Sequence, residues 1–189
     1  MHQIAIFASG SGSNAQRIAE HFAGHPHVRV GLILTNNPRA GVIDRARQLD
    51  IPVVVFTREQ FYGTGSVVAQ LRFFNIDFVV LAGFLWLVPD ALIAAYPDRI
   101  VNIHPALLPA HGGKGMYGMK VHEAVVAAGE KASGITIHLI DNEYDRGRIV
   151  FQAQCPVTSA DTPADVARNV QALEHEHFPS VIEKLVLAQ

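Results

Sequence analysis

Short apolar runs alternate with amphipathic stretches through the first half of the chain. The apolar runs cover residues 4–8, 28–35, 53–56, 78–84 and 100–104. The stretches between them place apolar residues at the spacing of a helix face. Strands that are apolar on both faces and separated by helices are typical of parallel sheets covered on both sides. The pattern therefore predicts a Rossmann-like α/β fold of three layers.

The pattern changes after residue 130. Two apolar segments, SGITIHLI and RIVFQAQCPV, are joined only by the short acidic link DNEYDRG. A link of this length cannot hold a crossover helix, so the two strands should pair antiparallel and extend the sheet. Thr162 followed by Pro163 predicts the start of a long C-terminal helix. We expect that helix to run to about Glu176, with Pro179 marking a kink or a new start.

Composition and charge narrow the class of protein. The 189 residues fit one domain spanning residues 1–189, or at most two small ones, and 49% hydrophobic residues supply a sizeable core. The formal net charge of −2 favours neither nucleic acid nor an anionic membrane as a partner. Cys155 is the single cysteine, which excludes an internal disulfide and is typical of a reducing cytoplasm. Because neither a bilayer-spanning run nor a signal peptide is visible, we expect a cytoplasmic protein.

The segment ASGSGSNAQ joins the first predicted strand to the first predicted helix. Gly10, Gly12 and Ala15 match the G-x-G-x-x-A spacing of a dinucleotide site. However, the second strand ends without the acidic residue that such a site uses to bind a ribose. The helix start offers free N–H groups, and Gly12 would let a phosphate approach the backbone. The polar side chains there are Ser11, Ser13 and Asn14. A site for one phosphate group is favoured, and a dinucleotide site or a plain tight turn remain alternatives.

Asn102 and His104 lie two residues apart in NIHPALLP, so both point to the same side of a predicted strand. Parallel sheets bind ligands outside the carboxyl ends of their strands, where the glycine loop also lies. Considered alone, this pair fits a capping asparagine and a packed core histidine better than it fits a catalytic site. The acidic link adds Asp145, a carboxylate that would raise the pKa of His104 by favouring its charged form. An amide donor, a histidine acid and a carboxylate suit direct transfer of an acyl group from a carrier to an amine.

Five segments together carry a resemblance to a known family: GSGSN, LAGF, NIHPALLP, DNEYDRG and LEHEHFP. In order and spacing, from Ile4 to about Ile182, they resemble the phosphoribosylglycinamide formyltransferase family. The motif N-x-H-P-x-L-L-P alone marks the wider formyltransferase superfamily. The glycine loop with Asn14, together with the late Glu174, narrows the resemblance to the purine-biosynthetic enzymes. The resemblance implies a single formyltransferase domain that moves the formyl group of 10-formyltetrahydrofolate to the amine of 5-phosphoribosylglycinamide.

The same resemblance implies roles for individual residues. The catalytic residues would be Asn102, His104 and Asp145. The residues that hold the substrate would be Gly12, Ser13 and Asn14 at the phosphate and Glu174 near the ribose. The folate-binding residues would be Leu85, Trp86, Leu87, Val88, Asn102, Ile140, Asp141, Asn142, Glu143 and Tyr144. The formyl-folate is a co-substrate, no metal ion is implied, and the protein would act on small molecules as a monomer or homodimer.

Two positions depart from the family pattern on the folate side, and three other functions stay open. Trp86 and the segment 63–65 stand where the family often has an arginine. A 10-formyltetrahydrofolate hydrolase would use water in place of the amine, but such enzymes usually carry an extra N-terminal domain, whereas this chain begins at its first strand. An amino-sugar N-formyltransferase leaves the phosphate loop less explained. A non-enzymatic Rossmann-type nucleotide-binding module would bind NAD.

The remaining histidines give weaker signals. His138, on a predicted strand, is more typical of a packed structural histidine than of a catalytic one. His122 fits either a helix cap or a residue that lines the site. We expect three histidines to be exposed in loops: His25, His27 and His111. The segment EHEH lacks the i, i+4 histidine pair of a zinc helix, so no metal site is expected.

Overall fold

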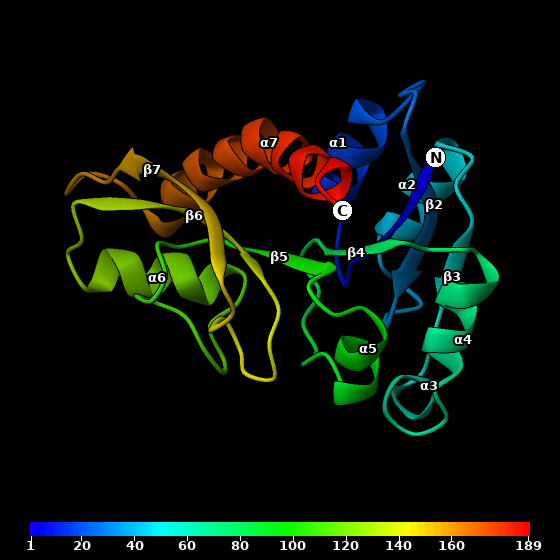
Figure 1. Ribbon diagram of the computed structural model, residues 1–189. Helices are drawn as coiled ribbons and strands as arrows, with labels where there is room; N and C mark the ends of the chain where they lie inside the picture. Colours follow the sequence, from blue (N-terminus) through cyan, green and yellow to red (C-terminus); the bar gives the residue numbers. More distant parts are fainter.

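The computed structural model describes residues 1–189 and contains a seven-stranded sheet with the order β3-β2-β1-β4-β5-β6-β7 (Figure 1). The strands are β1 His2–Phe7, β2 Val28–Thr35, β3 Val53–Val55, β4 Phe78–Leu81, β5 Ile100–His104, β6 Ala132–Leu139 and β7 Ile149–Pro156. The helices are α1 Ser13–His21, α2 Val42–Gln48, α3 Arg58–Tyr62, α4 Ser66–Phe73, α5 Asp90–Ala95, α6 Met119–Ala127 and α7 Pro163–Leu187. Strands β1 to β5 pair in parallel and β6 and β7 add antiparallel, which confirms the mixed sheet expected from the sequence.

The central strands send alternate side chains to two hydrophobic cores, one on each face of the sheet. In β1, Ile4 and Ile6 pack in the core that includes residues of α1, α2 and α7. Ala5 and Phe7 pack in the core that includes residues of α3, α4 and α5. All four side chains are completely buried. The expected three-layer arrangement, with helices on both faces of a mostly parallel sheet, is therefore confirmed.

The C-terminal helix is longer than the sequence indicates. Helix α7 begins at Pro163, as predicted, but continues through Pro179 to Leu187, so the expected end near Glu176 is wrong. A proline inside a helix removes one backbone donor, in this case the N–H that would reach four residues back. On either side of it, Phe178 and Ile182 are completely buried in the core. Burial of two large apolar side chains outweighs the loss of one hydrogen bond, and the helix continues.

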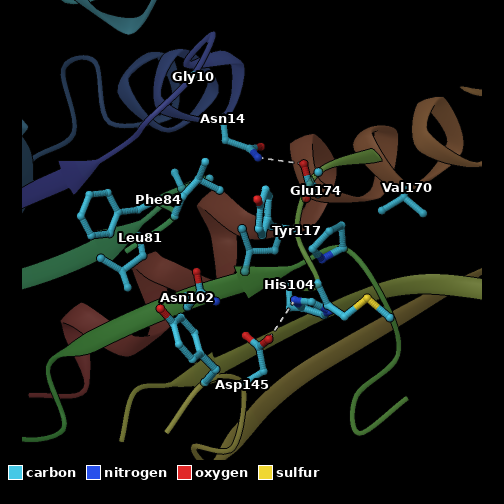
Figure 2. A pocket seen from close by; sticks show the side chains of 18 of the residues that line it. Gly10, Asn14, Leu81, Phe84, Asn102, His104, Tyr117, Asp145, Val170 and Glu174 are labelled. Atoms are coloured by element: carbon cyan, nitrogen blue, oxygen red, sulfur yellow. Dashed lines mark hydrogen bonds and ion pairs between the residues drawn. The ribbon is translucent and has the colours of Figure 1, made fainter. Parts of the chain in front are cut away.

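The arrangement of the strands gathers several loops at one edge of the sheet. Because β1, β4 and β5 are parallel neighbours, their carboxyl ends lie side by side there. The chain leaves this edge in loops of residues 8–12, 82–89 and 105–118. The link between β6 and β7, residues 140–148, folds back over the side chains of β5 (Figure 2). None of the helices combines the length and apolar character that crossing a membrane would need.

Candidate active site

A cleft of about 880 Å³ lies at the carboxyl edge of the central strands. Figure 2 shows that five polar residues from α1, β5, the β6–β7 link and α7 surround it: Asn14, Asn102, His104, Asp145 and Glu174. One wall is made by residues 113–118, which we call the glycine strap. The cleft thus joins the glycine loop and the NIHPALLP segment, as the topology of the sheet predicts.

His104 lies at the end of β5 and is 3% exposed. Its Nε2–H donates to the carbonyl of His111 at 2.8 Å, and its Nδ1 lies 3.4 Å from Oδ2 of Asp145. Both partners are acceptors, so they favour an imidazolium that carries protons on both nitrogens. Burial nevertheless sets the pKa of His104 below its ordinary value, because it outweighs the opposing charge of Asp145. The expected pairing is present and Asp145 raises the pKa of His104 as expected, but burial lowers that pKa by more.

Asp145 is held by contacts from three directions. Its Oδ2 accepts the N–H of Gly113 in the glycine strap at 2.9 Å, and its Oδ1 lies 3.6 Å from Nε2 of His138. Burial raises the pKa of Asp145, but its contacts with His138, His104 and Gly113 lower the pKa, and the lowering prevails. The carboxylate is therefore ionised at neutral pH, with its charge directed at His104.

Asn102 is fixed by His138, a residue that the sequence did not assign to the site. The register of β5 against β6 places these residues opposite each other. Asn102 Nδ2 donates to His138 Nε2 at 3.1 Å, and His138 Nδ1 donates to the carbonyl of Leu139 at 3.1 Å. His138 is packed and completely buried, as a structural histidine should be, yet it also touches two predicted catalytic residues. The pairing register was the missing signal, and it is not visible in the sequence.

The turn that follows His104 is tied down by a buried hydroxyl. Thr136 Oγ1 accepts the N–H of Leu108 at 2.9 Å and donates to the carbonyl of Ala106 at 2.7 Å. Gln152 Nε2 donates to the same hydroxyl oxygen at 2.8 Å and to the carbonyl of Leu108 at 3.0 Å. Satisfying these buried groups fixes the path of the chain between His104 and the glycine strap.

The glycine loop leaves the start of helix α1 open. Gly12 is its N-cap residue, with a φ of 77°, and makes no side-chain cap. Gln16 is the first residue of α1 whose backbone N–H donates to a backbone carbonyl. Helices α3 and α7, by contrast, are both closed by capping boxes. An uncapped helix start that lines a cleft is suited to an anion, as the sequence predicts.

Gly12 has a packing role besides the one expected of it. A Cβ at this position would lie 2.5 Å from Cγ2 of Val42, the first residue of α2. The glycine is therefore required by the packing of the loop on α2, in addition to any approach of a ligand. At Gly10, which also lines the cleft, a Cβ would meet nothing within 4 Å.

The polar residues at the start of α1 are linked to α7. Asn14 Nδ2 donates one of its two N–H groups to Oε2 of Glu174 at 2.8 Å, which leaves the other N–H for a phosphate. Ser13 Oγ accepts from Nε2 of Gln171 at 3.2 Å, which leaves its own O–H free to donate. Burial raises the pKa of Glu174, and the bond from Asn14 opposes this only in part. The cradle therefore combines backbone N–H groups, the Ser13 hydroxyl and a carboxylate of raised pKa.

The residues expected on the folate side line the same cleft, with one exception. The lining includes Leu85, Trp86, Leu87, Val88, Ile140, Asp141, Glu143 and Tyr144. Asn142 is not part of it. Trp86 is half-buried against Phe61 and Phe84, so it is both a core residue and a flat wall of the cleft. A flat, largely apolar wall is suited to a planar ring.

Comparison with known proteins agrees with this geometry. A family model described as formyl transferase matches residues 2–182. The chain belongs to the formyl transferase family. It is 45% identical over 186 residues to the chloroplastic phosphoribosylglycinamide formyltransferase of Arabidopsis thaliana, covering 95% of this chain but 64% of that protein. It is 34% identical to phosphoribosylglycinamide formyltransferase of Bacillus subtilis, covering 98% of this chain and 95% of the relative. The chain thus spans less than two thirds of the plant relative and nearly all of the bacterial one.

Solved structures show the same fold. Phosphoribosylglycinamide formyltransferase of Bacillus halodurans superposes with a TM-score of 0.86 at 39% identity, covering 97% of this chain and 94% of that one. The enzyme of Anaplasma phagocytophilum gives a TM-score of 0.89 at 30% identity, covering 99% of this chain and 88% of that one. The mixed sheet and the long C-terminal helix of this chain are therefore those of the family.

The remaining histidines of the chain agree with expectation only in part. His122 lines the cleft, is 6% exposed, and has an Nδ1 atom without a hydrogen-bond partner. His25 and His111 are partly buried and hydrogen-bonded to Glu183 and Glu130, so describing them as exposed loop residues is wrong. Only His27 is exposed as expected. His, Cys, Asp and Glu residues form no group of three or more that could hold a metal ion.

Proposed function

We propose that this chain transfers the formyl group of 10-formyltetrahydrofolate to the amine of 5-phosphoribosylglycinamide, a step of purine biosynthesis. The observation that carries the proposal is the meeting of Asn102, His104 and Asp145 in one cleft with the uncapped glycine loop. The names of the relatives in Arabidopsis thaliana and Bacillus subtilis support the same reaction. Residues 1–189 would form one formyltransferase domain acting on small molecules in the cytoplasm, which the single cysteine favours.

In the proposed reaction the substrate amine attacks the formyl carbon directly. The carbonyl oxygen becomes an oxyanion, the bond to the folate nitrogen then breaks, the nitrogen takes up a proton, and the attacking amine loses one. Asn102 Nδ2 has two N–H groups, of which one donates to His138 and the other serves the oxyanion. His104 Nε2 is held by the carbonyl of His111, so Nδ1 is the atom that supplies the proton. The charge of Asp145 favours that protonated form.

The binding roles follow the position of each group in the cleft. The N–H groups at Gly12 and Ser13, with the Ser13 hydroxyl, would hold the phosphate. Asn14 would act through Glu174, orienting that carboxylate toward the ribose hydroxyls. The segments 85–88 and 140–144 would enclose the pteridine of the formyl-folate, with Asn142 as the one residue of these segments outside the lining of the cleft. The route uses these side chains and calls on no metal ion.

Turnover with the phosphorylated glycinamide and a formyl-folate donor tests the proposal. Loss of donor absorbance should require the amine and should fall by about a hundredfold or more in Asn102→Ala, because a donor to the oxyanion is lost. His27→Ala, an exposed histidine outside the cleft, is the control and should keep full activity. Release of formate without the amine would instead indicate a hydrolase. NAD binding without any formyl transfer would indicate a nucleotide-binding module.

A further inference from the structure

The cleft holds few positive charges for a substrate that carries a phosphate dianion. Lys114 and Arg168 are the only lysine or arginine residues among those that line it. Four carboxylates share the lining, namely Asp141, Glu143, Asp145 and Glu174. A helix start alone supplies only about half a positive charge. A phosphate bound at the glycine loop therefore needs a cation nearby.

Lys114 and Arg168 lie at different ends of the cleft. Lys114 follows Gly113, whose N–H is bound to Asp145, so it belongs to the catalytic end. Arg168 lies on α7, one turn before Gln171, which donates to Ser13 Oγ at 3.2 Å. It is therefore next to the glycine loop.

The face of α7 toward the cleft leaves room beside the loop. The residues of α7 that line the cleft are Ala164, Ala167, Arg168, Val170, Gln171 and Glu174. Two of them bind α1 directly, Gln171 through Ser13 and Glu174 through Asn14. These bonds fix the distance between helix and loop, while the two alanines leave space there. Arg168 is the one cation among the residues of α7 that line the cleft.

Arg168 is held in a position that it can leave without damage to the fold. Its guanidinium pairs with Oδ1 of Asp165, and its side chain is 72% exposed. The other oxygen of Asp165, Oδ2, accepts the N–H of Thr162 at 3.0 Å and its hydroxyl at 2.6 Å, closing the helix cap. Those Thr162 bonds, with the ion pair, lower the pKa of Asp165 to about 2. An exposed i, i+3 pair is worth little, so Arg168 can exchange it for a phosphate while the cap stays intact.

We propose that Arg168 is the cation that neutralises the substrate phosphate, turning from Asp165 to the phosphate when the substrate binds. The inference rests on the proposed function, because that function supplies the phosphate ester. A guanidinium matches two phosphate oxygens with two parallel N–H groups, which an ammonium cannot do. Arg168 is thus a substrate-positioning residue that acts on binding and takes no part in the transfer itself.

Binding of ribose 5-phosphate, measured by calorimetry, tests this without turnover. Arg168→Ala should weaken binding by about tenfold or more, as the loss of a charge-assisted hydrogen bond requires. Arg168→Lys should lie between Arg168→Ala and the parent protein, and it also serves if the alanine variant fails to fold. Arg47→Ala is the matched control, because Arg47 forms the same i, i+3 pair with Asp44, is 71% exposed and lies outside the cleft. The control should bind within about twofold of the parent.

Turnover then separates this inference from the proposed function. In Arg168→Ala the KM for the phosphorylated glycinamide should rise about tenfold, with the KM for the formyl-folate unchanged. Ribose 5-phosphate binding within twofold of the parent would overturn the role of Arg168, whatever the activity. An equal loss of affinity for the unphosphorylated riboside would also overturn it, since Arg168 would then act on the fold. If the parent binds ribose 5-phosphate through Arg168 but transfers no formyl group, the proposed function fails and the phosphate contact stands.

Discussion

Substitution of Gly12 should cost more stability than substitution of any neighbour in the glycine loop. Its φ of 77° lies in the left-handed region, which costs a residue with a Cβ about 1–2 kcal/mol. The added Cβ would lie 2.5 Å from Cγ2 and 2.8 Å from Cα of Val42, so α2 itself must shift. Overpacking of this kind costs about 1–3 kcal/mol. Gly12→Ala should therefore lower the free energy of unfolding by about 2–5 kcal/mol, leaving a folded protein at 25 °C if the parent has a typical stability.

Urea unfolding followed by circular dichroism measures this loss against two controls. Gly10→Ala adds a methyl group to the same loop where nothing lies within 4 Å, so its stability should stay within about 0.5 kcal/mol of the parent. Because Gly10 lines the cleft, the added methyl group should also raise the KM for the phosphorylated substrate. Gly12→Asn separates the two causes at Gly12, because asparagine tolerates the left-handed region but carries a Cβ.

The contact with Val42 predicts that Gly12→Asn is about as destabilised as Gly12→Ala. Recovery of most of the stability in Gly12→Asn would show that the backbone angle alone matters and that the contact with α2 yields easily. A Gly12→Ala protein within about 0.5 kcal/mol of the parent would refute both parts of the reasoning.

Three further changes test the site. Asp145→Asn removes the charge that raises the pKa of His104, so burial is opposed only by the hydrogen bond to the His111 carbonyl. The His104 titration, followed by carbon-13 NMR of labelled imidazole, should move to lower pH. An unchanged or higher midpoint would show that Asp145 acts elsewhere. Glu174→Gln should raise the Tm at pH 7 and change it little near pH 4. Burial raises the pKa of Glu174, so the stability that its neutral form contributes at low pH is lost as the pH rises through the folded pKa and the carboxyl ionises. Glutamine stays neutral at both pH values and avoids this loss. An equal Tm gain at both pH values would contradict the ionisation argument. Thr136→Val leaves the Leu108 N–H and the Ala106 carbonyl unpaired. It should lower the free energy of unfolding in urea by about 2 kcal/mol or more and should also lower kcat. Thr158→Val, on an exposed turn, is the control and should leave kcat unchanged.

Local chemistry in the sequence determined a large part of this protein. Apolar runs separated by helical spacing require a parallel sheet covered on both faces, because each run has two faces to bury. The two-residue period of a strand places Asn102 and His104 on one side, and the order of the strands brings them to the glycine loop. Thr162 and Pro163 mark the start of α7 because capping is decided within one turn. These features depend on neighbours in the chain, which a sequence displays.

The tertiary structure alone decided what depends on distant partners. His138 meets Asn102 through the β5–β6 register, and a register is set by packing across strands rather than by either strand. Helix α7 passes Pro179 because the core buries Phe178 and Ile182, a contribution that helix propensity does not contain. The pKa of His104 falls although a carboxylate lies beside it, since the desolvation that opposes Asp145 exists only after the glycine strap and the acidic link have closed over the imidazole.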